Sequence, residues 1–326
     1  MRGGAFTITA AHEARPHEMR DPQRENIMAT TGFIGLGAMG QPMAANLVRK
    51  GHDLIVYDIA QNRTPPLRDL GATVAGSVAE VAEQAGIVVT MVPDSPQVEQ
   101  VVLGAGGILE AGAAGQLVMD MSTIAPETTD RVAAALSEAG RAFVDAPVGR
   151  LVTNAEAGTS LFMVGASEAD LERVRPLLEA MGDTILHCGG PGAGIRSKLV
   201  NNFLVMGINQ MNAEALALAQ GFGLDLATTL KVVGGTTAAN GQLSINWPNK
   251  VLKGDLEPGF RMALAHKDVS LAVDAARSFG LPLYAGAVVL ESLAMAKATG
   301  DLVDKDFSGI ADAVCRLGNL PPPRLT

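Results

Sequence analysis

Residues 35–40 read Gly-Leu-Gly-Ala-Met-Gly, between a short apolar stretch and a segment with the pattern of an amphipathic helix. Three glycines at this spacing, between a strand and a helix, are typical of a turn that holds the pyrophosphate of a dinucleotide. The first glycine allows the tight turn, the second lets the backbone approach phosphate, and the third brings the helix close to the strand. The helix N-terminus adds free N–H groups and the positive end of a dipole. The residues expected to contact the cofactor here are Gly35, Gly37, Ala38, Met39 and Gly40.

An acidic residue stands where such a site meets the ribose of the cofactor. The next apolar run, residues 54–57, ends in Asp58, 23 residues after Gly35. An acid at the end of the second strand hydrogen-bonds the ribose hydroxyls and repels a 2′-phosphate, so Asp58 favours NAD over NADP. The alternative is that Asp58 is an ordinary turn residue at the end of a strand.

The composition is that of a globular enzyme and excludes several other classes of protein. The chain has 326 residues, 48% of them hydrophobic and 18% charged, which is enough for two domains. A net charge of −9 argues against a nucleic-acid partner, since phosphate binding needs clustered Lys and Arg. No apolar run approaches the ~20 residues that span a bilayer, so we expect no membrane partner.

Cysteine and histidine usage points to a cytoplasmic protein without a metal. Two cysteines, Cys188 and Cys315, are too few for a disulfide framework and suit a reducing compartment. Histidines and cysteines are also too sparse and too scattered to predict a metal site.

Strand-like and helix-like segments alternate from residue 31 to about 145. The apolar runs are continuous rather than alternating, which indicates strands covered on both faces and therefore a parallel, doubly wound Rossmann sheet. Two more strands, around residues 161–164 and 184–186, flank a helix at 167–181 and extend this sheet. Expected strands lie at residues 33–34, 54–57, 73–75, 87–92, 117–121 and 142–145.

The pattern changes after residue 190. One helical pattern covers residues 193–221, which at 1.5 Å per residue is ~40 Å long, too long for a crossover helix of the sheet. Further helices are expected at 225–233, 236–250, 263–279, 283–298 and 305–315. We therefore predict an α/β protein with a Rossmann domain at 28–190 followed by an all-helical substrate and oligomerisation domain at 191–326. Residues 1–27 are polar, carry mixed charge and lack periodicity, which predicts a disordered extension.

Beyond these patterns, the chain resembles the β-hydroxyacid dehydrogenases, the family of 3-hydroxyisobutyrate dehydrogenase. The glycine turn continues as Gln-Pro-Met-Ala-Ala-Asn-Leu, which is similar to the opening signature of that family. Four further blocks match in the same order and span nearly the whole chain. They are residues 120–123 (Asp-Met-Ser-Thr), 145–149 (Asp-Ala-Pro-Val-Gly), 192–202 and 266–268 (His-Lys-Asp).

The resemblance implies that Lys198 is the catalytic lysine, with Asn202 beside it. Residues four apart share a helix face, so an ammonium and an amide can converge on one carbonyl oxygen. When a hydride reaches an aldehyde carbon, charge grows on that oxygen and a nearby acid must deliver a proton. Partial burial would lower the pKa of a lysine toward that task. The alternative is a solvated lysine on a helix, with Asn202 serving only in packing.

The same resemblance assigns residues around the expected cleft. It places Ser122 against the substrate and Thr123 on the nicotinamide side, at the carboxyl end of a strand. Their alternative role is to cap the helix that begins near residue 126. Val92 and Pro93 are expected along the cofactor. Lys267 is expected to reach cofactor or substrate across the domain cleft, the alternative being a surface lysine paired with Asp268.

The chain departs from the common family pattern at residues 149–151. Where Ser-Gly-Gly usually holds a substrate carboxylate, this chain has Gly149, Arg150 and Leu151. An arginine fork suits an anion with several oxygens. The change resembles the branch of the family that reduces 3-sulfolactaldehyde, and Asn201 joins these three residues as an expected substrate contact. Leu151, Val152 and Val205 stand where that branch would place small or polar residues.

We therefore predict an enzyme that reduces 3-sulfolactaldehyde to 2,3-dihydroxypropane-1-sulfonate reversibly, with NADH as cofactor. The nearest alternative is another short anionic aldehyde, namely succinic, methylmalonate or tartronate semialdehyde. An imine reductase and a non-catalytic dinucleotide-binding module are further alternatives, and Lys198 counts against both. The family also implies a homodimer or homotetramer built on the helical domain. The apolar positions 204, 211 and 218 fit such an interface, and fit an ordinary domain core equally well.

Overall fold

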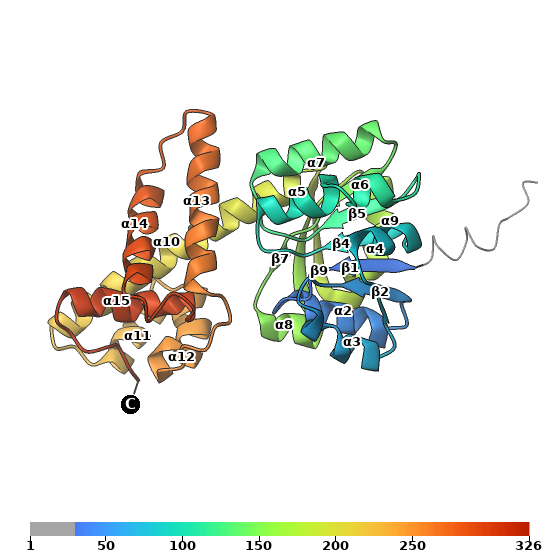
Figure 1. The fold of residues 1–326 in the computed structure, drawn as a ribbon. Helices are drawn as coiled ribbons and strands as arrows, with labels where there is room; N and C mark the ends of the chain where they lie inside the picture. Colours follow the sequence, from blue (N-terminus) through green and yellow to red (C-terminus); the bar gives the residue numbers. More distant parts are fainter. Residues whose placement is uncertain (1–29, 326) are drawn as a thin grey trace, which may run out of the picture.

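The computed structural model describes residues 30–325, so the predicted disordered extension at 1–27 lies outside the described residues. A single mixed sheet forms the N-terminal part (Figure 1). Its strands are β1 (Thr31–Ile34), β2 (Leu54–Tyr57), β3 (Thr73–Val74), β4 (Ile87–Thr90), β5 (Leu117–Asp120), β6 (Ala142–Asp145), β7 (Val148–Gly149), β8 (Ser160–Gly165) and β9 (Gly182–Gly189).

The central strands confirm the predicted parallel, doubly wound sheet. They run in the order β3-β2-β1-β4-β5-β6, and every neighbouring pair among them is parallel. The extension is mixed, because β8 is antiparallel to β6 and β7 but parallel to β9. The two-residue strand β7 was not predicted, since two residues are too few to show a period.

Helices cover both faces of this sheet. The two buried clusters show that one face carries α2 (Gly40–Arg49), α3 (Pro65–Asp69), α8 (Val152–Ala157) and α9 (Glu168–Met181), and the other α4 (Val78–Gln84), α5 (Ser95–Leu103), α6 (Ile108–Ala111) and α7 (Pro126–Glu138). Adjacent residues of β1 enter different cores, Phe33 with α2 and Ile34 with α4. Such burial on both faces explains the continuous apolar runs.

The C-terminal part is helical and is built around α10 (Ala193–Gly221), which leaves the sheet and runs through the helices that follow (Figure 1). The bounds of α10 match the predicted helix. The other helices are α11 (Leu226–Gly234), α12 (Trp247–Asn249), α13 (Met262–Ser278), α14 (Tyr284–Ala298) and α15 (Ile310–Leu317), with short segments η1 (Gln61–Arg63), η2 (Gln242–Asn246), η3 (Val251–Lys253) and η4 (Phe307–Gly309). Strand β9 ends and α10 begins on either side of residue 190, the predicted domain boundary.

The predicted continuous helix at 236–250 is wrong. Residues 235–240 form turns, followed by the π-helical segment η2 and the single turn α12. The side chain of Asn240 accepts a hydrogen bond from the Leu243 N–H (3.2 Å), so it satisfies backbone that a continuing helix would have used. Trp247 then buries its ring completely and donates a 2.7 Å hydrogen bond from Nε1 to Asn209 Oδ1 on α10. Tertiary anchoring of this ring outweighs the local helical pattern.

No helix within residues 30–325 is both long enough and apolar enough to cross a bilayer.

Candidate active site

The glycine turn between β1 and α2 has the shape that a dinucleotide requires. Gly35 has a φ of +100°, and a methyl group there would lie 2.2 Å from the main-chain oxygen of Met91. A methyl group at Gly40 would lie 2.0 Å from the Gly35 oxygen, so the turn and the first turn of α2 touch. By contrast, a methyl group at Gly37 would meet nothing within 4 Å. Backbone at Gly37 is therefore open to an incoming phosphate, and the turn fits the pyrophosphate of NAD.

Asp58 serves the turn directly. Its buried carboxylate accepts hydrogen bonds from the N–H groups of Leu36 (2.7 Å, to Oδ2) and Ala60 (2.7 Å, to Oδ1). Arg63 Nη1 lies 3.3 Å from Oδ2 and is half exposed. The alternative role as a turn residue is therefore real. It leaves capacity for the expected ribose contact, because each carboxylate oxygen accepts more than one hydrogen bond.

The ends of β4 and β5 meet beside this turn. Ser122 is buried and accepts a 3.0 Å hydrogen bond from the Val92 N–H through its hydroxyl oxygen. Helix α7 begins after Ala125 with no side-chain cap, so the alternative capping role of Ser122 and Thr123 is wrong. Pro93 follows Val92 at the same carboxyl edge of the sheet, where ligands of open α/β sheets bind.

Lys267 joins the two parts of the molecule. From α13 its ammonium donates a hydrogen bond to the main-chain oxygen of Thr123 and lies 3.1 Å from Asp268 Oδ1. Only 18% of the Lys267 side chain is exposed, so the alternative of a surface lysine is wrong, although its pairing with Asp268 is present. The structure thus brings Lys267 to the expected nicotinamide-side residue.

Lys198 lies in the second turn of α10, where that helix still packs on the sheet. Its Nζ donates a 2.7 Å hydrogen bond to the main-chain oxygen of Val148, directly before Gly149. Burial lowers the pKa of Lys198; the nearby Asp268 carboxylate opposes that shift and Lys267 adds to it. A lysine with a lowered pKa, held against the 145–149 segment, is suited to exchange a proton with a substrate oxygen.

Asn202 lies one turn further and is fully engaged. Its Nδ2 donates a 2.6 Å hydrogen bond to Asp268 Oδ2, and its Oδ1 accepts from Asn201 Nδ2 at 3.0 Å. Sequence reasoning assigned no site role to Asp268, which is 2% exposed and contacts both Asn202 and Lys267. The available signal was its place in the His-Lys-Asp block at 266–268.

Arg150 adopts a conformation that is rare for residues other than glycine. Its φ is +71°, in the left-handed region that costs an L-residue about 1–2 kcal/mol. The guanidinium reaches the start of β9, where Nη1 lies 2.7 Å from Asp183 Oδ1 and Nη2 3.0 Å from Thr184 Oγ1, and Nη1 also donates to the main-chain oxygen of Thr159 just before β8. The structure therefore places the backbone of Arg150 beside the Lys198 contact, but it directs the side chain to Asp183.

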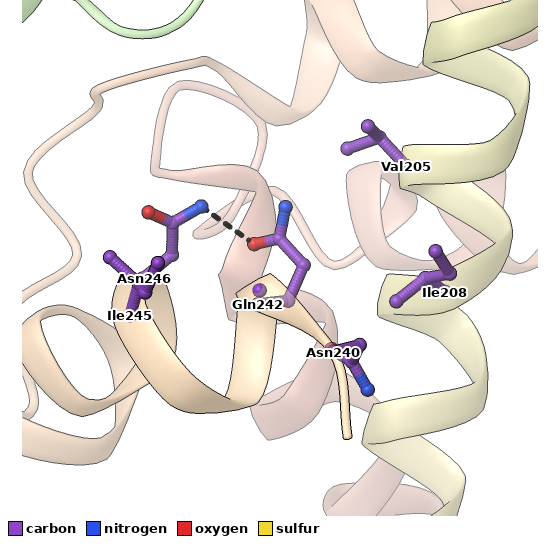
Figure 2. A pocket seen from close by; sticks show the side chains of 7 residues that line it. Val205, Ile208, Asn240, Gln242, Ile245 and Asn246 are labelled. Atoms are coloured by element: carbon purple, nitrogen blue, oxygen red, sulfur yellow. Dashed lines mark hydrogen bonds between the residues drawn. The ribbon is translucent and has the colours of Figure 1, made fainter. Parts of the chain in front are cut away.

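A pocket of about 320 Å³ lies along α10, beyond Asn202 (Figure 2). Val205 and Ile208 project from α10 on one side, and Gln242 faces them from η2 (Figure 2). The Gln242 Oε1 accepts a 2.9 Å hydrogen bond from Asn246 Nδ2, which orients the amide. Val205 is thus a lining residue of a pocket on the helix that carries Lys198.

Comparisons with known proteins agree with this geometry. Residues 30–190 match the family model described as the NAD binding domain of 6-phosphogluconate dehydrogenase, and residues 192–314 match that of NADP-dependent 3-hydroxyisobutyrate dehydrogenase. The 3-sulfolactaldehyde reductase of Escherichia coli is 42% identical over 88% of this chain and 96% of its own. The chain belongs to the 3-hydroxyisobutyrate dehydrogenase family.

Further similarities show the breadth of the 3-hydroxyisobutyrate dehydrogenase family. The 2-(hydroxymethyl)glutarate dehydrogenase of Eubacterium barkeri is 37% identical over 86% of this chain and 92% of its own. The structure of Mycobacterium tuberculosis 3-hydroxyisobutyrate dehydrogenase with L-serine has a TM-score of 0.82 and 35% identity, covering 88% of this chain and 99% of that one. Membership in this family makes the protein an NAD-dependent dehydrogenase.

Proposed function

We propose that this dehydrogenase reduces 3-sulfolactaldehyde to 2,3-dihydroxypropane-1-sulfonate with NADH, and that Arg150 selects the sulfonate. The observation that carries the proposal is the left-handed backbone of Arg150, immediately beyond the segment that contacts Lys198. A glycine would adopt this conformation without strain, so an arginine here retains a strained backbone at a functional position. The similarity to the Escherichia coli 3-sulfolactaldehyde reductase supports the same substrate.

In the proposed reaction the residues divide the work by position. NADH supplies the hydride when it is bound. Lys198 gives a proton from Nζ to the carbonyl oxygen as charge develops there, and takes it back in the oxidative direction. Asn202 is held by its hydrogen bond to Asp268 one turn beyond Lys198. Asn201, whose Nδ2 donates to Asn202, is proposed to meet the substrate from the same turn of α10.

A sulfonate gives Arg150 a physical role in this proposal, in which the guanidinium exchanges its partner Asp183 for the substrate anion. The sulfonate is permanently charged and has three oxygens, which match the donors of a guanidinium. Gly149 and Leu151 flank Arg150, and the Leu151 N–H donates to Asn154 Oδ1 at 3.3 Å, which fixes the backbone on this side of the arginine. Only 35% of the Arg150 side chain is exposed, so a pair with an anion is less screened there than on an open surface.

A second candidate function rests on Val205. This residue lines the pocket along α10 with methyl groups and offers no hydrogen-bond donor. A carboxylate semialdehyde with a longer apolar arm, in the manner of the 2-(hydroxymethyl)glutarate relative, would use that surface better than a sulfonate. Succinic, methylmalonate and tartronate semialdehydes are the substrates to compare.

Initial-rate kinetics decide between these functions. We would measure kcat/KM for 3-sulfolactaldehyde and succinic semialdehyde, each with NADH and NADPH, in wild-type protein and in Arg150→Ala. With NADH, we expect kcat/KM to be higher for 3-sulfolactaldehyde than for succinic semialdehyde. The ratio of the two values should fall by about tenfold or more in Arg150→Ala. A carboxylate preference, or an advantage that survives in Arg150→Ala, overturns the proposal. Arg175→Ala, which removes an exposed arginine of α9 paired with Glu172, is the matched control.

The proton-transfer role needs its own variant. Lys198→Ala should reduce kcat by about 100-fold or more, the usual weight of a positioned acid. Lys198→Arg keeps the charge but holds its proton too tightly to act as an acid, so it should be nearly as slow. Turnover by Lys198→Ala at the wild-type rate would rule out the general-acid assignment.

We also propose a homodimer or homotetramer in the cytoplasm. Leu204, Met211 and Leu218 repeat every seven residues along one face of α10 and are 55%, 66% and 58% exposed. They do not form the core of this chain, which leaves a second copy as the partner that would cover them. Free Cys188 and Cys315 support a reducing compartment.

A further inference from the structure

Asp145 ties the sheet to the start of the helix that carries Lys198. It is the last residue of β6 and is 2% exposed. Its Oδ1 accepts a 2.6 Å hydrogen bond from the Gly192 N–H, and its Oδ2 accepts a 2.6 Å hydrogen bond from the Ile195 N–H. One carboxylate thus binds two of the N–H groups that the first turn of a helix leaves without partners.

The space around this carboxylate leaves it one position. A methyl group on Gly165 would lie 2.2 Å from Asp145 Oδ1, and one on Gly194 would lie 2.9 Å from Oδ2. Gly165 is also the residue of β8 that pairs with Asp145 in the sheet. Glycines on both sides therefore let β8 and α10 close onto the carboxylate.

The same segment touches the helix a second time, at the lysine itself. Val148 lies three residues after Asp145, and its main-chain oxygen accepts the Lys198 Nζ hydrogen bond of 2.7 Å. The two contacts fix α10 at residues 192–195 and again at Lys198. Loss of the first contact would let the helix start shift, and the lysine would shift with it.

We infer that Asp145 is a positioning residue for Lys198. The ionised carboxylate of Asp145 holds the start of α10, and this sets the position of the Lys198 ammonium against the substrate-binding segment. The inference rests on the proposed role of Lys198 as proton donor. A carboxylate accepts both N–H groups, whereas a protonated carboxyl or an amide accepts through one oxygen only. Asp145 must therefore be ionised to accept both hydrogen bonds from the start of α10.

The surroundings of Asp145 bear on when it is ionised. Burial raises its pKa to about 6, the two backbone hydrogen bonds lower it, and the charge of Asp120 on the neighbouring strand β5 raises it further. Arg196, in the first turn of α10, is the cation that interacts with it. Asp145 is therefore mostly ionised at neutral pH and loses its charge as the pH falls through about 6.

The test compares Asp145→Asn with Asp130→Asn at pH 7. Asp130 pairs with Arg196 on the same turn of α10 but from the exposed surface, so its variant is the matched control. Asp145→Asn should lower kcat by about tenfold to a hundredfold, because small displacements of a catalytic group have effects of this size. KM for the aldehyde should change by less than about threefold, and Asp130→Asn should resemble wild type. Unchanged kcat in folded Asp145→Asn overturns the inference.

A pH profile separates positioning from general damage. Wild-type kcat should fall below pH 6, and Asp145→Asn should lack that limb, because its amide does not titrate. A limb that persists in Asp145→Asn belongs to another group, such as His266 beside Lys267, and contradicts the inference. Thermal unfolding and NADH binding, followed by fluorescence, check that the variant is folded with an intact glycine turn.

Two further variants distinguish failure of the Asp145 inference from failure of the proposed function. Asp145→Glu retains the charge but lengthens a side chain for which β8 and α10 leave no room, so it should also lower kcat while keeping an acid limb. Lys198→Ala is assayed alongside. Full activity in Lys198→Ala defeats the proposed function, whereas loss of activity there with normal kcat in Asp145→Asn defeats only the role of Asp145.

Discussion

Asn202 on α10 donates a 2.6 Å hydrogen bond from Nδ2 to Asp268 Oδ2 on α13. The second oxygen of Asp268 lies 3.1 Å from Lys267 Nζ, and that lysine donates in turn to the main-chain oxygen of Thr123 in the loop after β5. One buried carboxylate therefore connects α10, which carries the proposed catalytic Lys198, to Lys267 on α13. The arrangement also supplies the negative charge that holds up the pKa of Lys198 against burial.

Replacement of Asp268 by Asn should change the pH dependence of reduction. Without the carboxylate, the pKa of Lys198 falls further, since burial and Lys267 both lower it. In the proposed reaction protonated Lys198 is the proton donor, so kcat for reduction should begin to fall at a lower pH than in wild type. The pH profile of kcat measures this. Asp274→Asn, which removes an exposed partner of Arg277 on the same helix, should leave the profile unchanged. A shift to higher pH would contradict the charge argument.

Replacement of Val205 by Ser should improve the reduction of 3-sulfolactaldehyde. The new hydroxyl would enter the pocket one turn beyond Asn201, where it could donate to a sulfonate oxygen. A single added hydrogen bond predicts a KM lower by about threefold to tenfold, with kcat unchanged. Val200→Ser, on an exposed side of α10, is the control. A constant KM would mean that the anion does not reach this turn.

Replacement of Asp58 by Asn should relax the preference for NADH. The change removes the charge that repels a 2′-phosphate and frees Arg63, which now lies 3.3 Å from Asp58, to meet that phosphate. The ratio of kcat/KM for NADPH to that for NADH should rise by about tenfold or more. Asp69→Asn, an exposed acid of α3, should leave the ratio at its wild-type value. If the ratio is also unchanged in Asp58→Asn, Asp58 does not contact the ribose of the cofactor.

Replacement of Met211 by Lys should dissociate the proposed oligomer. The variant places a charge in the middle of the exposed apolar face of α10, where an interface would have to bury it unpaired. Size-exclusion chromatography with light scattering should show a smaller species than wild type. Leu70→Lys, on the sheet part of the molecule, is the control. A wild-type mass that is already monomeric would refute the proposed oligomer.

Replacement of Asp145 by Asn should also alter stability with pH. Burial raises the pKa of Asp145 to about 6 from 3.8, so its contribution to stability is present below pH 3.8 and is lost as the pH rises through about 6. The free energy of unfolding of Asp145→Asn, minus that of wild type, should therefore be larger at pH 7 than at pH 4, by about 3 kcal/mol at most. Urea unfolding at both pH values measures the difference. If the difference is the same at both, Asp145 does not carry a raised pKa.

Local sequence patterns predicted most of the scaffold. The period of 3.6 residues over 193–221 marked α10, and the continuous apolar runs marked β2 and β6 as buried strands. The pattern failed at 236–250, where the buried ring of Trp247 and the side chain of Asn240 favour turns and a π-helical segment. Periodicity indicates which face of a segment is buried, but it does not indicate the tertiary contacts that can favour another backbone conformation.

The sequence by itself determined the glycine turn, the acid after the second strand, and the spacing that puts Lys198 and Asn202 on one helix face. These are local properties, set by backbone geometry over a few residues. Only the tertiary structure decided that Asp145 holds the start of α10, that Asp268 engages Asn202, and that the Arg150 side chain turns to Asp183. Those contacts join residues 33 to 66 positions apart, and their geometry depends on how whole elements pack.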